Sequence, residues 1–132
     1  MPACAIIGGD PLHIFASAAT VKAKSGYDVV SSLRGEPIEL VKGQLTGLPF
    51  PAAAEIVLEG EIDPQHLRNE GPFGEYPLYY TRLGPMPWLQ VTAVTMRKQP
   101  IYVDVFNAHK EHLVLGALPR MGRILRRTLD GF

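Results

Sequence analysis

The order of apolar positions in the first part of the chain predicts one strand followed by two helices. Residues 3–7 form a short apolar run that two glycines close, a pattern typical of a buried strand that leads into a turn. A helix is then predicted over residues 11–25, because Asp10 is a favourable N-cap, Pro11 suits the first helical position and apolar residues follow at helical spacing. The run 27–33 predicts a second, short helix.

From residue 38 onward the apolar period changes to two, which predicts strands. Ile56, Leu58 and Ile62 are the apolar positions of a predicted half-buried strand. They alternate with positions that include Glu55 and Glu59. This alternation predicts that the strand lies in a sheet with one face toward the core.

Three later segments complete the predicted fold. Residues 89–93 and 101–106 alternate around an Arg-Lys-Gln-Pro turn, which predicts a hairpin. Residues 113–129 repeat apolar side chains every four positions, which predicts an amphipathic helix. Helices at both ends of a set of antiparallel strands predict an α+β domain with a curved or barrel-like sheet.

The composition narrows the class of protein. The chain has 132 residues, a length typical of one domain, and its 46% hydrophobic and 20% charged residues are typical of globular proteins. Thirteen basic and thirteen acidic residues give zero formal net charge, so no long-range field would attract a nucleic acid or an anionic membrane. No segment approaches the roughly 20 apolar residues of a membrane span, and no signal peptide is predicted. Cys4 is the single cysteine, which excludes an intrachain disulfide, and a cytoplasmic location is expected.

Two carboxylates flank a glycine-rich turn at residues 70–75, which read Glu-Gly-Pro-Phe-Gly-Glu. Glycine and proline favour a tight, preorganised turn, so that Glu70 and Glu75 can face one pocket beside an aromatic ring. Two close carboxylates beside an apolar wall differ in their affinity for a proton, which suits a proton-transfer site. On spacing alone, a loop with two solvated glutamates is the better interpretation.

Two other polar clusters are interpreted as structural. Residues 8–11 could form a phosphate loop between strand and helix, but Asp10 would occupy the free helical N–H groups and repel an anion. His109, Glu111 and His112 lack the spacing of known metal ligands and fit a solvated first helical turn. No metal site is therefore predicted.

A set of short segments, spread over most of the chain, matches the sequence of one known family in the same order. These segments are residues 7–11, 33–37, 39–42, 51–52, 54–60, 70–75 and 95–102. Together they closely resemble the UbiD family of prenylated-flavin-dependent carboxy-lyases. The resemblance implies a split β-barrel of the flavin-reductase type, mostly antiparallel, with flanking helices. It also implies non-oxidative decarboxylation or carboxylation of a small aromatic or α,β-unsaturated acid on prenylated FMN.

The same resemblance implies roles for residues of this chain. Glu75 is similar to the family's proton donor to the carbon that carbon dioxide leaves, and Glu70 to its network partner. Tyr76 would lie next to the flavin. The cofactor would act as the electron sink while the protein supplies orientation and the proton.

The chain also departs from the family pattern. Residues 1–132 resemble the C-terminal two-thirds of the central cofactor-binding domain, and the N-terminal and C-terminal family domains are absent. The missing part includes an Asn…Tyr-Arg segment that helps to hold the flavin phosphate and its metal, and the arginine that pairs with the two glutamates. Gly26 aligns with a metal-binding glutamate of the family, and the nearest acid, Asp28, is displaced. The family's metal site is therefore expected to be lost, and this chain alone is expected to bind prenylated FMN weakly or not at all.

These departures leave several functions open. A second copy of the chain or a complementary UbiD-like subunit could supply the missing residues, which predicts an assembly. A shortened, non-catalytic relative could instead keep the β-barrel for oligomerisation or partner binding, which Gly26 favours. A small β-barrel could also bind ordinary flavin or another planar ligand without the decarboxylase chemistry.

Overall fold

The chain divides into two compact units. The computed structural model describes residues 1–18, 25–75, 78–104, 106 and 109–110. The first unit contains residues 1–10, 39–73 and 80–104, and the second contains residues 11–38, 74–79 and 105–132. All strands of the described residues lie in the first unit, and both of their helices lie in the second.

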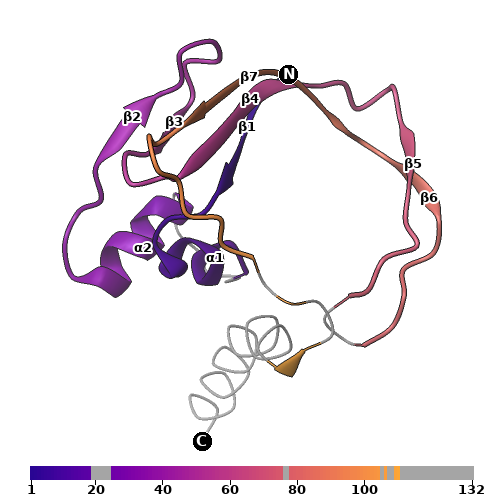
Figure 1. The fold of residues 1–132 in the computed structure, drawn as a ribbon, viewed down its shortest axis with the longest axis horizontal. Coiled ribbons are helices and arrows are strands. Elements are labelled where there is room, and N and C mark those ends of the chain that lie inside the picture. The colour runs from indigo at the N-terminus through magenta and orange to yellow at the C-terminus, as the bar shows by residue number, and fades with distance from the viewer. Residues whose placement is uncertain (19–24, 76–77, 105, 107–108, 111–132) are drawn as a thin grey trace, which may run out of the picture. The chain divides into compact units, whose positions relative to one another are not determined.

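A three-stranded antiparallel sheet in the order β1-β4-β7 contains the longest strands of the first unit (Figure 1). Its strands are β1 (Pro2–Ile7), β4 (Ile56–Ile62) and β7 (Leu89–Met96). The backbone groups of Met1 and Ile62 exchange two further hydrogen bonds, of 2.7 and 2.8 Å, which extend the pairing of β1 with β4. The strands predicted near residues 3–7, 55–62 and 89–93 are confirmed.

One face of this sheet buries a carboxylate. Val57 and Glu59 on β4 are 3% and 0% exposed, whereas Ile56 and Leu58, on the opposite face, are only half-buried. The predicted apolar positions of this strand are therefore not its most buried ones. The alternation rule misleads here because the turn of residues 44–46 supplies hydrogen bonds to Glu59, and a carboxylate with enough donors can be buried.

Two short antiparallel ribbons complete the strands of the first unit (Figure 1). They are β2 (Leu40–Lys42) with β3 (Pro49–Pro51), and β5 (Arg68–Glu70) with β6 (Gly84–Met86). The turn between β2 and β3 is closed by the Gly43 N–H, which donates to the Leu48 carbonyl oxygen at 2.9 Å. The ribbon β5–β6 leads directly into the 70–75 segment and so sets where the candidate site begins.

The second unit contains two helices that contact each other, α1 (Pro11–Ala18) and α2 (Gly26–Arg34). Ser25 caps α2 with its side-chain oxygen, which accepts a backbone N–H at 3.1 Å, and Gly35 ends the helix with φ at 80°. The predicted short helix over 27–33 is thereby confirmed. Residues 19–24 of the longer predicted helix lie outside the described part of the chain.

The strand predicted over residues 101–106 is wrong where the structure describes it, because residues 101–104 and 106 are not in a strand. The Ile101 N–H donates to the Glu55 Oε2 at 3.1 Å, and the Arg97 guanidinium lies 3.3 Å from the other oxygen of that carboxylate. Pro100 has no N–H and Ile101 uses its own on a side chain, so this segment leaves the sheet. The predicted helix over 113–129 lies outside the described residues.

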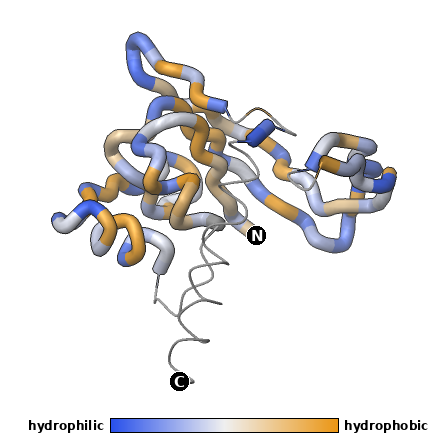
Figure 2. The backbone as a smooth tube through the Cα atoms, turned by 90° about the horizontal axis from the view of Figure 1, so that it is seen from below, coloured by the Kyte–Doolittle hydropathy of each residue, from blue (hydrophilic) through white to orange (hydrophobic). Residues whose placement is uncertain are grey.

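Antiparallel strands and two helices agree with the predicted α+β class. Hydrophobic and hydrophilic residues are interspersed along the described chain (Figure 2). Within the described residues, no helix has the length and apolar character that a membrane crossing requires.

Candidate functional site

Glu70 is the last residue of β5, where it lies opposite Gly84 of β6. Its side chain is exposed. Within the described residues, no hydrogen bond or ion pair engages this carboxylate. The ribbon therefore fixes the backbone of Glu70 and leaves its carboxylate open to solvent or to a ligand.

The backbone just after Glu70 passes close to the segment that leads back from the loop into β6. Gly71 has φ at 91°, and a Cβ at this position would lie 3.3 Å from the Arg82 carbonyl oxygen. Both the positive φ and the close backbone favour glycine here. The following peptide bond, Gly71-Pro72, is cis. The sequence prediction of a tight turn is in keeping with this geometry.

Glu75 is half-buried, and hydrogen bonds on both sides hold its backbone. Its N–H donates to the Tyr79 carbonyl oxygen at 2.9 Å, and its carbonyl oxygen accepts the Leu78 N–H at 3.0 Å. Leu78 has φ at 72°, in the left-handed region that a leucine rarely adopts. Strained residues of this kind persist where the surrounding bonds over-determine the backbone, often at functional sites.

The two carboxylates belong to different units, Glu70 to the first and Glu75 to the second. Their arrangement around one pocket stays a prediction. Tyr76 lies outside the described residues, and its predicted place beside the flavin stays a prediction as well.

The position of the expected metal ligand lies at the start of α2. Gly26 is the first residue of this helix, and a Cβ built there meets no other atom within 4 Å. Asp28 follows in the first helical turn. In the described part of the chain, no three His, Cys, Asp or Glu side chains gather in a way that could hold a metal ion.

The turn after β1 passes close to two other segments of the first unit. Gly8 and Gly9 have φ at 78° and 114°. A Cβ at Gly8 would lie 2.7 Å from the Ile101 carbonyl oxygen and 2.8 Å from the Glu55 Cβ. The close approach of Ile101 and Glu55 explains why glycine stands at position 8. The predicted loss of the family's metal site and the predicted weak binding of prenylated FMN stay predictions.

Glu59 is a buried carboxylate that the sequence analysis placed on the polar side of a strand. Its Oε1 accepts the Gln44 N–H at 3.0 Å, and its Oε2 accepts the Leu45 N–H, the Thr46 N–H and the Thr46 hydroxyl at 3.1, 2.9 and 2.8 Å. The bonds from Thr46, followed by those from Gln44 and Leu45, lower the pKa of the Glu59 carboxyl although burial opposes them. A Cβ at Gly43 would collide with the same carboxylate, so Gly43 leaves room for it. Charge alternation could not reveal this residue, because the donors lie 13 to 15 positions away.

A pocket of about 400 Å³ lies in the first unit, between the end of β4 and the start of β7. Trp88, Gln90 and Thr92 line one side of it. The Arg68 guanidinium stacks on the Trp88 ring, 3.6 Å from its centroid, in a cation–π contact. The sequence analysis did not predict this pocket, because the pairing of β4 with β7 brings its walls together.

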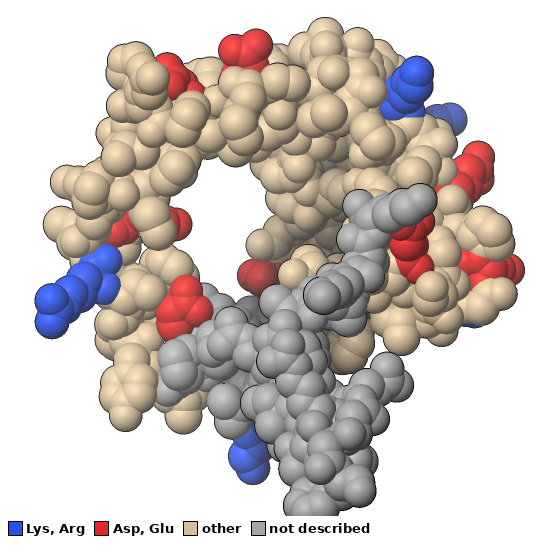
Figure 3. All heavy atoms as spheres, turned by 180° about the vertical axis from the view of Figure 1, so that it is seen from behind, with Lys and Arg blue, Asp and Glu red and all other residues tan. Residues whose placement is uncertain are grey.

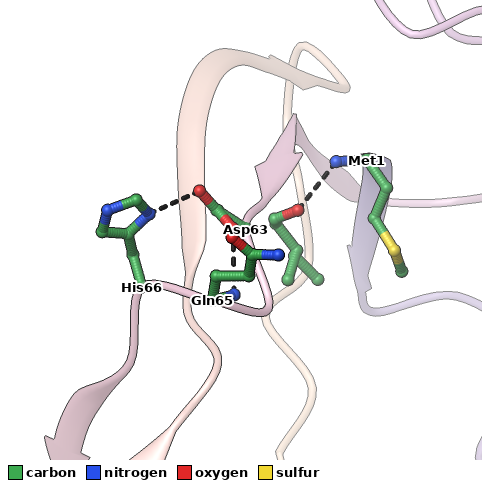
Figure 4. A network of polar contacts seen from close by, with 5 residues as sticks. Met1, Asp63, Gln65 and His66 are labelled. Carbon is green, nitrogen blue, oxygen red and sulfur yellow. Dashed lines mark hydrogen bonds and ion pairs between the residues drawn. The ribbon is translucent and has the colours of Figure 1, made fainter.

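Asp63 forms a small polar network at the rim of the same pocket (Figure 4). Its carboxylate accepts the Gln65 N–H at 2.9 Å and contacts the His66 Nδ1. These contacts, the Gln65 N–H first, hold the pKa of the Asp63 carboxyl below its ordinary value. The network closes the turn after β4 and involves none of the predicted site residues.

On the face that Figure 3 shows, the charged side chains of the described residues are scattered among uncharged ones, and among them no basic patch gathers. This distribution agrees with the zero net charge of the sequence. It gives no support to a nucleic-acid surface on that face.

Comparison with known proteins connects this arrangement to one family. Residues 1–110 match the model of the UbiD family, described as the 3-octaprenyl-4-hydroxybenzoate carboxy-lyase Rift-related domain. An uncharacterised protein of Aquifex aeolicus (strain VF5) is 43% identical over 102 residues, which are 76% of this chain and 21% of that protein.

Solved structures give the same result. The UbiD-class enzyme HmfF from Pelotomaculum thermopropionicum in complex with FMN is 42% identical, with a TM-score of 0.89 over 95% of this chain and 28% of that one. An evolved dimeric form of HmfF in complex with prFMN gives a TM-score of 0.88. The vanillic acid decarboxylase ShVdcCD of Sedimentibacter hydroxybenzoicus, in its open form, is 35% identical, with a TM-score of 0.71 over 77% of this chain and 22% of that one.

The extent of these matches defines what they show. The chain spans between a fifth and a third of the length of these relatives. Within that span, the family model covers residues 1–110, and this range includes the whole 70–75 segment. The chain belongs to the UbiD family.

Proposed function

We propose that the chain is a domain or small subunit of a UbiD-type carboxy-lyase, which decarboxylates or carboxylates a small aromatic or α,β-unsaturated acid without net oxidation. The observation that carries this proposal is the family match across the 70–75 segment, in which hydrogen bonds hold the Glu75 backbone on both sides. The relatives add support, because one of them is a vanillic acid decarboxylase and another is a UbiD-class enzyme with prFMN.

In this proposal the chain forms a split β-barrel of the flavin-reductase type, as a single domain over residues 1–132. The antiparallel sheet β1-β4-β7 and the ribbons beside it are the strands from which such a barrel would be built. The domain would correspond to the C-terminal two-thirds of the family's central cofactor-binding domain.

In the proposed reaction, a proton replaces carbon dioxide on one carbon atom of the substrate, or carbon dioxide replaces the proton. In decarboxylation, the bond between this carbon and the carboxylate breaks, carbon dioxide leaves, and a proton from the Glu75 carboxyl forms the new C–H bond. The proton on Glu75 is then restored from solvent, with Glu70 as the network partner. Prenylated FMN, when bound, would supply the electron sink that makes the bond between this carbon and the carboxylate easier to break. A positioned acid of this kind contributes typically 10²–10⁴-fold to a rate.

The proposal requires a partner. Two observations support this: no cluster of three possible metal ligands is found among the described residues, and the family resemblance aligns Gly26 with a metal-binding glutamate. We therefore propose that a second copy or a complementary UbiD-like subunit supplies the missing arginine and metal ligands. An assembled enzyme is thus the form in which activity is expected.

The test is Glu75→Gln in that assembly. This substitution keeps the shape of the side chain and removes the acid, so turnover should fall by about 10²–10⁴-fold while the melting temperature changes little. Glu61→Gln is a matched control, because Glu61 is an exposed glutamate on β4, and it should leave turnover unchanged. An active assembly in which Glu75→Gln keeps full turnover would remove this residue from the mechanism.

The alternative is a non-catalytic module of the UbiD family that serves oligomerisation or partner binding. Gly26 favours it, because a glycine cannot bind a metal through its side chain. The same experiment separates the two functions: a stable assembly that shows no carboxy-lyase activity with prenylated FMN and a panel of aromatic and α,β-unsaturated acids would favour the module.

A further inference from the structure

One side chain closes the base of the loop that carries Glu75. The Thr81 N–H donates to the Phe73 carbonyl oxygen at 2.9 Å. The Thr81 hydroxyl lies 3.3 Å from the Phe73 nitrogen, whose N–H it accepts, and 3.3 Å from the Phe73 carbonyl oxygen, to which it donates. Thr81 thus engages both backbone polar groups of the residue across the loop.

This contact keeps the register of the ribbon below it. Glu70 pairs with Gly84 across β5 and β6. Phe73 lies three residues after Glu70, and Thr81 lies three residues before Gly84, so their contact follows the same pairing. The backbone bond from Thr81 to Phe73 therefore continues the pairing of the ribbon beyond the cis bond at Gly71-Pro72, and the Thr81 hydroxyl reinforces it.

Few apolar contacts add to these bonds on the returning segment. Tyr80 and Leu83 are 80% and 60% exposed, so their side chains bury little apolar surface, whereas Phe73 is 38% exposed. Gly74 follows Phe73 directly and adds conformational freedom. Segments with few apolar contacts open locally at low cost, and their order then depends on individual hydrogen bonds.

We propose that Thr81 is a positioning residue for Glu75. Its hydroxyl holds the two ends of the 74–80 loop together, and the backbone of Glu75 then keeps one conformation during proton transfer. A small displacement of a reacting group lowers a rate strongly, which is why a fixed loop matters for an acid. The effect on turnover rests on the proposed function, whereas the effect on loop order does not.

Loop order is measured by hydrogen–deuterium exchange on the full chain. Thr81→Val removes the hydroxyl and keeps the shape, and the loss of two weak hydrogen bonds should speed exchange of the Glu75 and Leu78 amides by about tenfold. Thr81→Ser keeps a hydroxyl and should exchange as the wild type does. Thr92→Val is the matched control, because the Thr92 hydroxyl also donates to a backbone carbonyl, that of Glu59, at 3.3 Å. It should leave exchange of the Glu75 and Leu78 amides unchanged. Equal exchange of these amides in Thr81→Val and the wild type would overturn the proposal.

Turnover of the assembled enzyme tests whether Thr81 positions Glu75 for proton transfer. Thr81→Val should lower kcat by about tenfold with KM nearly unchanged, because a displaced acid affects a step after binding, and Thr81→Ser should restore it. A loosened loop with unchanged kcat would overturn the positioning role. If the wild-type assembly has no activity at all, the proposed function fails and the positioning role fails with it, while the exchange data still decide whether Thr81 orders the loop.

Discussion

At the scale of single residues, the buried carboxylate of Glu59 ties the β2–β3 turn to the sheet. Four hydrogen bonds reach it from residues 44–46, and the side chain is 0% exposed. A buried charge is tolerated only when donors surround it, and removing the charge leaves those donors without a partner. The turn should therefore depend on the ionised form of Glu59.

This dependence predicts a response to pH. The hydrogen bonds lower the pKa of the Glu59 carboxyl, Thr46 contributing most. The stabilisation is then fully present above the unfolded-state pKa of about 4.3 and is lost as the pH falls through the folded-state pKa. Glu59→Gln should lower the melting temperature at pH 7 by about 5 °C or more and should flatten its decline below about pH 4.3. Thermal unfolding followed by circular dichroism between pH 7 and pH 3 measures both effects.

The control for Glu59 is on the same strand. Glu61 is exposed, so Glu61→Gln should keep the wild-type pH dependence. Asp63 also has a lowered pKa, but it is present in all three proteins and drops out of the comparison. An identical acid response of Glu59→Gln and the wild type would show that Glu59 does not stabilise the fold through its charge.

The contrast between Glu59 and Glu75 shows what sequence reasoning reaches at this scale. Glu75 could be singled out because residues 70–75 resemble a family segment, and its backbone is held by hydrogen bonds. Glu59 could not, because a charged residue in an alternating strand fits the solvent side equally well. Its burial depends on a turn whose donors lie more than ten positions away in the sequence.

At the scale of elements, the first turn of α2 contains a glycine that can be replaced. Gly26 has open space around its Cβ position. Glycine is less favourable than other residues in a helix, and an acid in the first turn interacts well with the helix dipole. Gly26→Glu should therefore raise the free energy of unfolding by about 0.5–1 kcal/mol, measured by urea denaturation.

Two further substitutions calibrate this prediction. Gly26→Ala adds a Cβ without a charge, and the difference between the two variants gives the contribution of the carboxylate. Gly35→Ala should instead destabilise the protein by about 1 kcal/mol, because Gly35 ends α2 with φ at 80°. A loss of stability in Gly26→Glu would contradict the reading of Gly26 as a tolerant position.

The short helix and the three strands of the main sheet were predicted from their local patterns, whereas one further predicted strand was wrong. The Ser25 and Gly35 caps, close in sequence to α2, bound the helix that the pattern predicts. Residues 101–106 show the same alternation as β7, yet the described part of that segment forms no strand, because the Glu55 carboxylate takes the Ile101 N–H. Only a distant side chain distinguishes the two segments.

At the scale of the whole molecule, the chain belongs to the UbiD family and matches part of the length of its relatives. The relatives are three to five times longer than their matched part, and the described residues gather no metal cluster. Several apolar side chains are also strongly exposed, among them Tyr80 at 80% and Tyr102 at 66%. Where such side chains gather into one large patch, the patch commonly marks an interface.

The last prediction is that cofactor binding follows assembly. The family resemblance aligns Gly26 with a metal-binding glutamate. We therefore expect the chain alone to bind prenylated FMN weakly or not at all, and we expect binding to appear with a subunit that supplies the Asn…Tyr-Arg segment. Sedimentation velocity and flavin absorbance measured on the same samples test this directly. Tyr80→Ser removes an exposed aromatic side chain beside the Glu75 loop. If Tyr80 lies at the centre of the interface, this variant should weaken assembly by about tenfold or more. Tyr102→Ser serves as a comparison, because Tyr102 is a similarly exposed tyrosine. A monomer that binds prenylated FMN tightly and stoichiometrically by itself would contradict the prediction, since the missing ligands would then lie within this chain.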